Sequence, residues 1–432
     1  MMAASAHAAG ALFIALSGPN FDAHAFLPDV IARGAAGLLV SEPPIIAGHA
    51  AVIVVKDPLA ALQRLGQAVR RRSGARVVAI TGSAGKTTTK EATAACLAAR
   101  YRVFWNPGNL NNHIGLPLSL LELRHGPDVA VVELGMNHAG EIRALVGLAD
   151  PDVRVWTNVG NAHIGHFGGI DAIAEAKAEI LEGLTPQTVV VVNADDPRVM
   201  RHVTQGAAKT LTFGIDQPAD VWAQRVDDRG FDGTNADVTT PWGDLSLNLA
   251  LAGRPNLLNV LAAATVALES GVEAAEVTRV TASLAAVPRR GALTTLANGA
   301  RLVDDSYNAS PAAVNVMLST LAVTRADGRR IAVLGEMREL GEDARRWHAD
   351  CGRAAAEAGV DLLVAIGGPD ADGLVEGARE AGFDPQHIMR FPDSASAADP
   401  VAALLRSGDL VLVKGSRGTR TDIVADRLKA VA

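Results

Sequence analysis

The sequence predicts a three-domain α/β protein in which the two larger domains each contain a mainly parallel sheet. Short apolar runs such as Val77–Ile80 and Val129–Glu133 alternate with helix-like segments, as the strands of βαβ units do. A second alternation of this kind runs from Leu302–Asp305 to Leu410–Val413, after a boundary near Pro288. The chain of 432 residues is long enough for roughly two to four domains.

The first domain is predicted to span residues 1–74. Its expected strands are three apolar runs, Ala11–Leu16, Gly37–Val40 and Val52–Val55. A helix is expected over Leu59–Arg72, because apolar residues recur at spacings of three and four from Leu62 to Val69. The basic run Arg70–Arg72 is interpreted as the solvated end of that helix.

The second domain is predicted over residues 75–287 and the third over residues 288–432. After its first strand, the second domain has further apolar runs at Val129–Glu133, Val153–Thr157 and Val189–Asn193. Lys209–Leu251 is expected to form short strands and turns, and Asn256–Leu268 a helix. The third domain has four expected strands separated by helices, at Leu302–Asp305, Ile331–Leu334, Leu362–Ala365 and Leu410–Val413.

Composition and charge argue against several classes of protein. Hydrophobic residues make up 49% and charged residues 20% of the chain, which suits a folded globular protein. The net charge of -7 and the lack of a long basic block argue against nucleic acid as a partner. The best candidate for a membrane span, Leu247–Leu268, is interrupted at Arg254, so no span is expected. Two cysteines, Cys96 and Cys351, are too few for a disulfide framework and fit a reducing cytosol, with Cys96 expected to be buried.

A glycine turn between a strand and a helix gives the first chemical signal. The turn consists of Thr81, Gly82, Ser83, Ala84, Gly85, Lys86, Thr87 and Thr88. Gly82 and Gly85 would let backbone N–H groups face phosphate oxygens, Lys86 would approach the β- and γ-phosphates, and Thr87 would offer a hydroxyl to Mg²⁺. Ile80 stands where the longer form of this loop has a glycine, so the motif is a shortened variant. A chance glycine turn is the alternative, and the strand–turn–helix context argues against it.

The phosphate loop and eight later segments together resemble the Mur ligase family, in the branch that adds a D-alanyl-D-alanine dipeptide. Each segment is weak alone, but they follow the family's order and cover nearly the whole chain. The segments are Asn106–Asn112, Val132–Met136, Asn161–His163, Glu175–Lys177, Asn193–Pro197, Asp304–Ala309, Gly335–Gly341 and Lys414–Gly418. The branch that adds the third amino acid is the nearest rival. Its expected Asp-Asn-Pro-Arg and Tyr-Ala-His type segments are not found, and Asp305–Ala309 favours the dipeptide branch.

The resemblance implies a three-domain Mur ligase architecture. An N-terminal domain would bind a UDP-linked substrate, a central P-loop domain would bind ATP, and a Rossmann-like C-terminal domain would bind the incoming dipeptide. The implied reaction joins D-alanyl-D-alanine to UDP-N-acetylmuramoyl-tripeptide through an acyl phosphate, giving the pentapeptide used in peptidoglycan synthesis. Because both reactants of the first step are anions, charge neutralisation is the main catalytic demand. A cytoplasmic monomer is expected.

The resemblance also implies a site for two Mg²⁺ ions formed by Thr87, Glu133, His163 and Lys177. Glu133 ends an apolar strand and has the oxygen ligands that Mg²⁺ prefers. A lone histidine is a poor ligand for Mg²⁺ on chemistry alone, so the role of His163 rests on the resemblance, and His166 is the alternative. Lys177 is expected to be carbamylated, which would replace an ammonium with an anionic group bearing two oxygens. An ordinary solvated lysine is the competing interpretation.

Nucleotide and substrate contacts complete the implied site. Asn256 and Asn259 resemble a nucleotide-contacting segment, although Pro255 replaces the histidine of that pattern. Arg290 and Asp305 would reach the nucleotide from the third domain. The implied substrate-binding residues are Asn109, Asn111, Asn112, Tyr307, Asn308, Lys414, Ser416 and Arg417. Without the family, each of these could equally be a polar loop residue, and Asn193, Asp195 and Asp196 an ordinary turn.

One departure from the family concerns the UDP site. The family normally begins a few dozen residues earlier, with a Thr/Ser-Asp-Ser/Thr-Arg segment that contacts UDP, and Gly10–Leu16 resembles the stretch after it. Either the true start lies upstream or this is a shortened form. Two further hypotheses follow, an inactive nucleotide-binding relative and a generic P-loop ATPase or GTPase. Lys86, Glu133 and Lys177 argue against the first, and a second α/β domain carrying Asp305 argues against the other.

Overall fold

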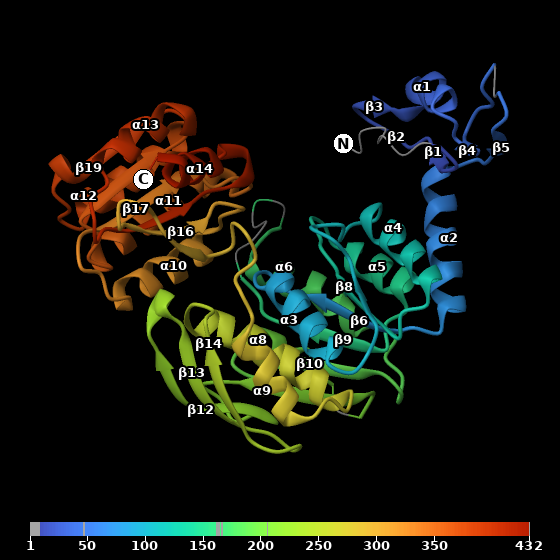
Figure 1. Cartoon of the computed structure of the whole chain (residues 1–432), viewed down its shortest axis with the longest axis horizontal. Coiled ribbons are helices and arrows are strands. Elements are labelled where there is room, and N and C mark those ends of the chain that lie inside the picture. Colours follow the sequence, from blue (N-terminus) through green and yellow to red (C-terminus); the bar gives the residue numbers. More distant parts are fainter. Residues whose placement is uncertain (1–8, 46–47, 161–164, 166, 205, 432) are drawn as a thin grey trace.

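The computed structural model describes residues 9–45, 48–160, 165, 167–204 and 206–431. Its α/β architecture has a small N-terminal domain and a larger C-terminal domain on opposite sides of a central domain (Figure 1). Large and mostly parallel sheets form the two bigger domains, as the sequence predicts. None of the helices in these ranges is long and apolar enough to cross a membrane.

The N-terminal domain has a parallel three-stranded sheet in the order β1-β4-β5. Its strands are β1 (Leu12–Ile14), β4 (Gly37–Val40) and β5 (Ala51–Val54), close to the three predicted runs. Helix α1 (Leu27–Ala32) packs Leu27 and Val30 against β4, and a short hairpin pairs β2 (Ser17–Gly18) with β3 (Phe21–Asp22). Every residue of β5 is exposed, so this edge of the sheet is apolar and uncovered by other described residues.

Helix α2 (Pro58–Ser73) fastens the N-terminal sheet to the central domain. Asp57 caps its first turn, and Gly66 lets it approach the central domain closely, since a Cβ there would lie 2.9 Å from the Pro117 carbonyl oxygen. Arg70 was expected at a solvated helix end, and this expectation is wrong because its side chain is buried. It donates to the carbonyl oxygens of Ala149 (2.8 Å) and Asp150 (2.7 Å), at the carboxyl end of another helix.

The central domain is built on a nine-stranded sheet in the order β14-β13-β12-β11-β10-β9-β6-β8-β7. The strands from β6 to β11 are parallel, and β12 to β14 form an antiparallel extension. Their bounds are β6 (Arg76–Thr81), β7 (Val103–Trp105), β8 (Val129–Glu133), β9 (Val153–Trp156), β10 (Val189–Asn193), β11 (Lys209–Gly214), β12 (Val221–Asp228), β13 (Thr234–Thr239) and β14 (Leu245–Leu249). The runs of valine and isoleucine in β6, β8 and β10 are fully buried, as a parallel sheet covered on both faces requires.

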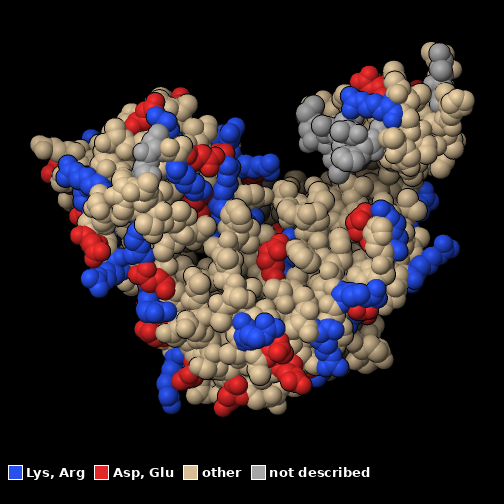
Figure 2. All heavy atoms as spheres, viewed as in Figure 1, with Lys and Arg blue, Asp and Glu red and all other residues tan. Residues whose placement is uncertain are grey.

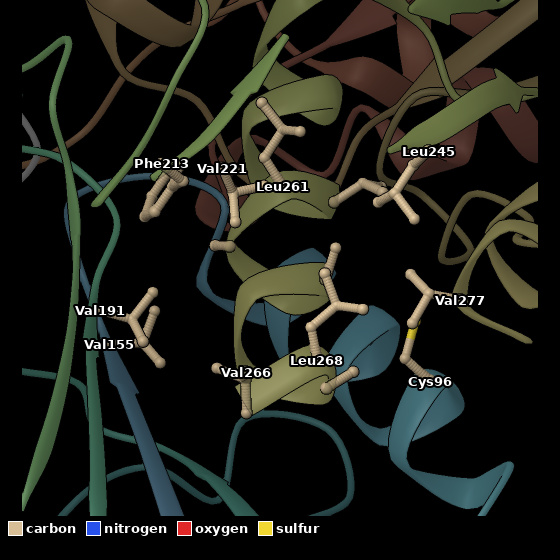
Figure 3. Packing of buried hydrophobic residues seen from close by; sticks show 14 of the residues in the cluster. Cys96, Val155, Val191, Phe213, Val221, Leu245, Leu261, Val266, Leu268 and Val277 are labelled. Carbon is tan, nitrogen blue, oxygen red and sulfur yellow. The ribbon is translucent and has the colours of Figure 1, made fainter. Parts of the chain in front are cut away.

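Helices cover both faces of this sheet. One face packs against α3 (Lys86–Ala98), α8 (Gly253–Glu269) and α9 (Ala274–Ala282), and Figure 3 shows Leu261, Val266 and Leu268 of α8 in this core. The other face packs against α4 (Gly115–Leu121), α5 (Glu141–Ala149), α6 (Ile170–Ala178) and α7 (Pro197–Arg201). Cys96 lies in the first core, as expected, and burial raises the pKa of its thiol to about 12.

The C-terminal domain contains a second sheet in the order β15-β16-β20-β17-β18-β19, in which only β15 is antiparallel to its neighbour. The strands are β15 (Ala292–Thr295), β16 (Arg301–Asp305), β17 (Arg330–Gly335), β18 (Leu362–Ile366), β19 (Ile388–Phe391) and β20 (Leu410–Lys414). The helices are α10 (Pro311–Val323), α11 (Ala344–Glu357), α12 (Asp372–Glu380), α13 (Ser394–Leu404) and α14 (Asp422–Val431). The four strands predicted for this domain are confirmed within a residue or two.

The central and C-terminal domains share a packed contact at the turn between β12 and β13. Phe231 of this turn is buried in the hydrophobic core of the C-terminal domain. Its backbone N–H donates to the Thr324 hydroxyl (2.9 Å), and the neighbouring Asp232 forms an ion pair with Arg301. A second contact joins the Gly165 N–H to the Glu339 carbonyl oxygen (3.0 Å). The domain boundary is therefore bridged by side-chain packing as well as by the chain itself.

We predict that replacing Arg70 with methionine lowers the free energy of unfolding by about 3 kcal/mol. The change removes the donor from the carbonyl oxygens of Ala149 and Asp150, and it leaves the Asp152 carboxylate with the Val77 N–H but without its ion pair. Urea unfolding followed by circular dichroism measures the loss. Arg71→Met is the matched control, since Arg71 is exposed on the same helix turn and its change is expected to stay within about 0.5 kcal/mol. Equal effects of the two variants would contradict the role of Arg70.

Candidate active site

Four neighbouring parallel strands of the central sheet end at one edge, and the predicted site residues gather there. β6 lies between β8 and β9, and β10 follows β9. In open α/β sheets this carboxyl edge is where ligands bind. The Thr81 hydroxyl at the end of β6 donates to the Leu134 carbonyl oxygen (3.0 Å), so the two loops that leave β6 and β8 are tied together.

The two glycines of the phosphate loop are required by close contacts. A Cβ on Gly82 would lie 1.9 Å from the Thr157 hydroxyl oxygen, and one on Gly85 would lie 2.1 Å from the Asn259 Oδ1. Gly85 also has a φ of 80°, in the left-handed region that favours glycine, and directly precedes α3. The loop is thus wrapped closely around the start of α3, whose free N–H groups favour an anion.

Hydrogen bonds join the phosphate loop to the loop after β9. The Ser83 hydroxyl donates to the Gly160 carbonyl oxygen (3.1 Å), and Asn158 Oδ1 accepts from the Ala84 N–H (2.9 Å). The Thr157 hydroxyl donates to the Ala84 carbonyl oxygen (2.9 Å). Sequence reasoning did not single out Thr157 and Asn158. The available signal was their position, immediately after a predicted strand at the ligand-binding edge.

Glu133 is the buried carboxylate at the centre of the site. One carboxylate oxygen accepts from the Thr87 hydroxyl (2.7 Å) and the other from the Asn111 side-chain amide (2.7 Å). Asn106 Oδ1 accepts from the backbone N–H of Glu133 (3.0 Å). Two residues expected to bind Mg²⁺, Thr87 and Glu133, are therefore in direct contact, and an amide from the predicted substrate loop completes the group.

Lys177 projects from α6 into the same site as a buried amine. Its exposed fraction is 2%, and no described residue forms a hydrogen bond or an ion pair with it. Burial lowers the pKa of Lys177 well below the ordinary lysine value; the charge of Lys86 lowers it further, and Glu133 partly opposes the shift. A neutral amine is the reactive form for carbamylation, so the environment suits the modification expected from the sequence.

Lys86 and Arg290 add positive charge at the same point. The Lys86 ammonium donates to the carbonyl oxygens of Gly82 (2.8 Å) and Ser83 (3.4 Å) within its own loop. Burial is the main cause of its lowered pKa, Glu133 opposes the shift, and the charge of Arg290 adds to it. Arg290 therefore lies close enough to act on the phosphate loop, although it belongs to the C-terminal side of the domain boundary.

One further residue is expected to bind Mg²⁺. His163, and its alternative His166, lie outside the described residues. Within the described ranges, no cluster of three or more histidine, cysteine, aspartate or glutamate side chains could hold a metal ion. Thr87, Glu133 and Lys177 are therefore the described members of the expected Mg²⁺ site.

The three predicted asparagines after β7 have different surroundings. Asn111 is bonded to Glu133, and Asn112 Oδ1 accepts from the N–H groups of Ile114 (3.1 Å) and Gly115 (2.8 Å) at the start of α4. Asn109 is exposed, and its side chain forms no hydrogen bond with the described residues. Asn109 is thus the member of this group with a side chain fully available to a ligand.

Asn256 and Asn259 lie beside the phosphate loop at the first turns of α8. Asn259 Oδ1 accepts from the Thr89 hydroxyl (3.2 Å), and its amide donates to Asn256 Oδ1 (3.3 Å). A small cavity next to Gly85 is lined by Asn158, Asn193, Phe213, Pro255, Leu258 and Asn259 among others. Pro255 lines this cavity where the family pattern has a histidine. The cavity therefore has an apolar ring at this position and lacks the polar side chain of a histidine.

The Asn193–Pro197 segment holds neighbouring loops in place. Asn193 donates to the Thr157 carbonyl oxygen (2.9 Å), and Asp196 accepts from the Val159 N–H (2.7 Å) while capping α7. Asp195 accepts from three successive backbone N–H groups of the loop after β11, including that of Ile215 (2.7 Å). Both carboxylates accept hydrogen bonds from backbone N–H groups, which agrees with the interpretation of this segment as an ordinary turn.

The C-terminal domain presents its predicted residues at the carboxyl ends of β16 and β20. The Lys414 ammonium donates to the Asp305 carboxylate (2.5 Å) and to the Asn308 carbonyl oxygen (3.0 Å). The Arg290 guanidinium lies over the Tyr307 ring, 4.1 Å from its centre. Burial raises the pKa of Asp305, while Lys414 and Arg290 oppose that shift. The charge of Arg290 thus opposes the rise in the pKa of Asp305 and adds to the fall in the pKa of Lys86. Arg290 therefore links residues of the central and C-terminal domains at one site.

Ser416 and Arg417 differ in exposure. Ser416 is buried, and its hydroxyl accepts from the Arg338 N–H (3.0 Å). Arg417 is exposed and has no ion pair with any described residue, so its guanidinium is free to bind an anion. Figure 2 shows basic side chains on the flank of the C-terminal domain that faces the N-terminal domain across an open gap.

The assembled site suits reactions between anions. A phosphate loop, two lysines and an arginine surround one buried carboxylate, and a second domain adds Asp305 and Lys414. Cations in a poorly solvated site stabilise the negative charge of transferring phosphoryl groups. The structure therefore brings together the described members of the predicted nucleotide and metal sites.

Comparison with known proteins identifies the family. Residues 80–267 match the model of the Mur ligase middle domain, and residues 289–417 match that of the Mur ligase glutamate ligase domain. Relatives named UDP-N-acetylmuramoyl-tripeptide–D-alanyl-D-alanine ligase include one from Escherichia coli, which is 36% identical over 97% of this chain and 91% of its own length. The one from Bacillus subtilis is 33% identical over 97% and 90%.

Solved structures give the same result. A crystal structure of MurF from Acinetobacter baumannii superimposes with a TM-score of 0.88 at 33% identity, covering 98% of this chain and 92% of that one. MurF ligase from Thermotoga maritima, in complex with ADP, gives 0.84 at 30% identity, covering 98% and 95%. With both domain models matched in order and relatives above 30% identity over almost its whole length, this chain belongs to the Mur ligase family.

Proposed function

We propose that the protein is an ATP-dependent ligase that joins D-alanyl-D-alanine to UDP-N-acetylmuramoyl-tripeptide. The observation that carries the proposal is the gathering of Lys86, Glu133 and Lys177 at one strand edge, with Arg290 linking them to Asp305 of the C-terminal domain. The names of the relatives from E. coli and B. subtilis support the choice of substrates. The product would be the UDP-linked pentapeptide used in peptidoglycan synthesis.

The reaction balances as two transfers. A carboxylate oxygen of the tripeptide attacks the γ-phosphorus of ATP, the bond to the β-phosphate oxygen breaks, and ADP leaves. The dipeptide amine then attacks the acyl carbon of the acyl phosphate, loses a proton, and inorganic phosphate departs as the amide forms. Lys86 and Arg290 would offset the negative charge of the transferring phosphoryl group, and the N–H groups at the start of α3 would hold the phosphates.

The protein residues fit Mg²⁺ as the accompanying cation. Thr87, Glu133, His163 and a carbamylated Lys177 would hold the ions, which neutralise phosphate charge when bound. The support for carbamylation is physical, because the Lys177 amine, which has no hydrogen-bond partner among the described residues, is buried beside Lys86 and Glu133. An added carboxylate would give this position two oxygens and would turn repulsion from Lys86 into attraction.

Substrate contacts are assigned from exposure and chemistry. The free amide of Asn109 would meet the UDP-linked peptide, together with Asn111 and Asn112. Asn256, Asn259 and Asp305 would contact the nucleotide. The exposed guanidinium of Arg417 would bind a carboxylate of the incoming dipeptide, alongside the remaining residues of that face, Tyr307, Asn308, Lys414 and Ser416.

We assign residues 1–74 to UDP-substrate binding, 75–287 to ATP binding and 288–432 to the incoming dipeptide. Because one chain supplies the phosphate loop and the residues facing it, a monomer in the cytoplasm would be sufficient for the reaction. Two alternatives remain testable, ligation of the third amino acid and an inactive nucleotide-binding relative.

We predict that the purified protein releases phosphate from ATP only when both UDP-N-acetylmuramoyl-tripeptide and D-alanyl-D-alanine are present with Mg²⁺. Phosphate release is measured colorimetrically, and mass spectrometry identifies the UDP-linked pentapeptide. Glu133→Gln is expected to lower kcat by on the order of 100-fold or more, because it removes the charge that binds cations at the reacting phosphate. ATP turnover without the dipeptide would favour a generic ATPase, and no turnover at all would favour the inactive relative.

We predict that ligase activity depends on carbon dioxide through Lys177. Wild-type protein in degassed buffer without bicarbonate should lose activity and regain it when bicarbonate is added, and Lys177→Met should stay inactive in both. Lowering the pH should weaken the response, since protonation removes the neutral amine. The surface variant Lys209→Met is the matched control. Activity of wild-type protein that ignores bicarbonate would contradict carbamylation.

The same lysine makes a separate prediction about stability. Because the pKa of Lys177 is lowered on folding, the unfolded chain binds its proton more readily, and the free energy of unfolding should rise with pH up to the ordinary lysine value of 10.5. In bicarbonate-free buffer, Lys177→Met should therefore be more stable than wild-type protein at pH 7, and the difference should shrink at pH 9. Urea unfolding at the two pH values measures both. A variant less stable than wild type at pH 7 would show that the buried amine has an unrecognised partner.

A further inference from the structure

Lys90 of α3 is a fully buried lysine that the proposed reaction leaves without a role. Its side chain has an exposed fraction of 0%, which is rare for a lysine. The ammonium donates to the carbonyl oxygens of Asn106 (2.6 Å) and Gly108 (3.3 Å) and lies 3.2 Å from a Glu91 carboxylate oxygen. Its three protons therefore have three acceptors, two of them on the backbone of the loop after β7.

That loop is connected to the centre of the active site by further hydrogen bonds. Asn106 is buried and accepts from the Glu133 N–H (3.0 Å) with its side-chain oxygen, while its amide donates to the Leu110 carbonyl oxygen (3.1 Å). Further along the loop, Asn111 donates to the Glu133 carboxylate (2.7 Å). The turn held by Lys90 thus fixes both the backbone and the side chain of Glu133.

The position of Lys90 on α3 links this loop to the phosphate loop. Lys90 lies one helical turn after Lys86, and the intervening Thr87 bonds to the other oxygen of Glu133 (2.7 Å). One helix therefore begins at the phosphate loop and, one turn later, holds the loop that presents Asn109. An apolar side chain could fill the same space, but it would leave the buried Asn106 carbonyl oxygen without this donor and would release the Gly108 carbonyl oxygen.

We propose that Lys90 is a positioning residue that fixes the loop Asn106–Asn112, and through it Glu133, to the helix that binds ATP. Its role rests on the proposed function, because the loop is assigned to the UDP-linked peptide. Lys90 donates to the loop after β7 and to no described residue of the phosphate loop, so its removal affects the substrate loop more than the phosphate loop. The expected signature is a change in KM for the peptide substrate with little change in nucleotide affinity.

The test compares Lys90→Met with wild-type protein. We expect KM for UDP-N-acetylmuramoyl-tripeptide to rise at least tenfold, and the Kd for ADP, measured by calorimetry, to stay within twofold. Lys90→Gln, which keeps a shorter donor, should give an intermediate KM. Arg330→Met is the matched control, because Arg330 also donates to two backbone carbonyl oxygens, those of Leu321 (3.3 Å) and Thr324 (3.2 Å), in the C-terminal domain. Its KM for the UDP-linked substrate should match wild type.

The outcomes separate the positioning role from a purely structural one. An unchanged KM in Lys90→Met overturns the proposal, as does an equal loss of ADP binding and peptide affinity. Failure of both Lys90 variants to fold, judged by circular dichroism, also overturns it in favour of a structural lysine. Wild-type protein without ligase activity would instead refute the proposed function, and the ADP measurement would then show only whether the phosphate loop tolerates the change.

Discussion

The parallel pairing of β6 between β8 and β9 is the constraint on which the rest of the site depends. Because these strands run in register, Thr81, Glu133 and Thr157 emerge at one edge even though the sequence separates them widely. Each then bonds to a neighbouring loop, as Thr81 does to the Leu134 carbonyl oxygen and Thr157 to that of Ala84. The register of the strands therefore sets where the site residues lie, and hydrogen bonds between the loops fix their orientation.

The described part of the active site contains more positive charge than the buried Glu133 carboxylate neutralises. Lys177 is buried and Lys86 is partly buried, and the repulsion that Lys86 exerts on Lys177 is offset only in part by Glu133. Arg70 and Lys90, two other buried cations, are bonded to backbone carbonyl oxygens. The contrast separates two uses of a buried cation: Arg70 and Lys90 hold loops, whereas the Lys177 amine, to which no described residue is hydrogen-bonded, is available for chemistry with a ligand.

The sequence predicted most strands of the two larger sheets, since uniformly apolar runs such as Val189–Asn193 are typical of strands covered on both faces, but it did not predict the short strands β7, β15 and β19. It also located Lys86, Glu133 and Lys177 through motifs. It could not show that Arg70 is buried, because that depends on α5 ending beside α2, a contact between distant segments. For the same reason it did not separate Asn109 from Asn111 and Asn112, which share a composition but differ in what surrounds them. Local patterns specify elements, and tertiary contacts decide which polar side chains remain free.

The Phe231 contact has a consequence for how this chain can be recombined. A ring from the turn between β12 and β13 completes the hydrophobic core of the C-terminal domain, so that domain is not a self-contained module when cut near residue 288. A chimera that exchanges C-terminal domains between relatives has to carry a matching β12–β13 turn. Without it, the core of the C-terminal domain would contain a cavity. Any exchange of the C-terminal domain is thereby tied to the sequence of a turn in the central domain.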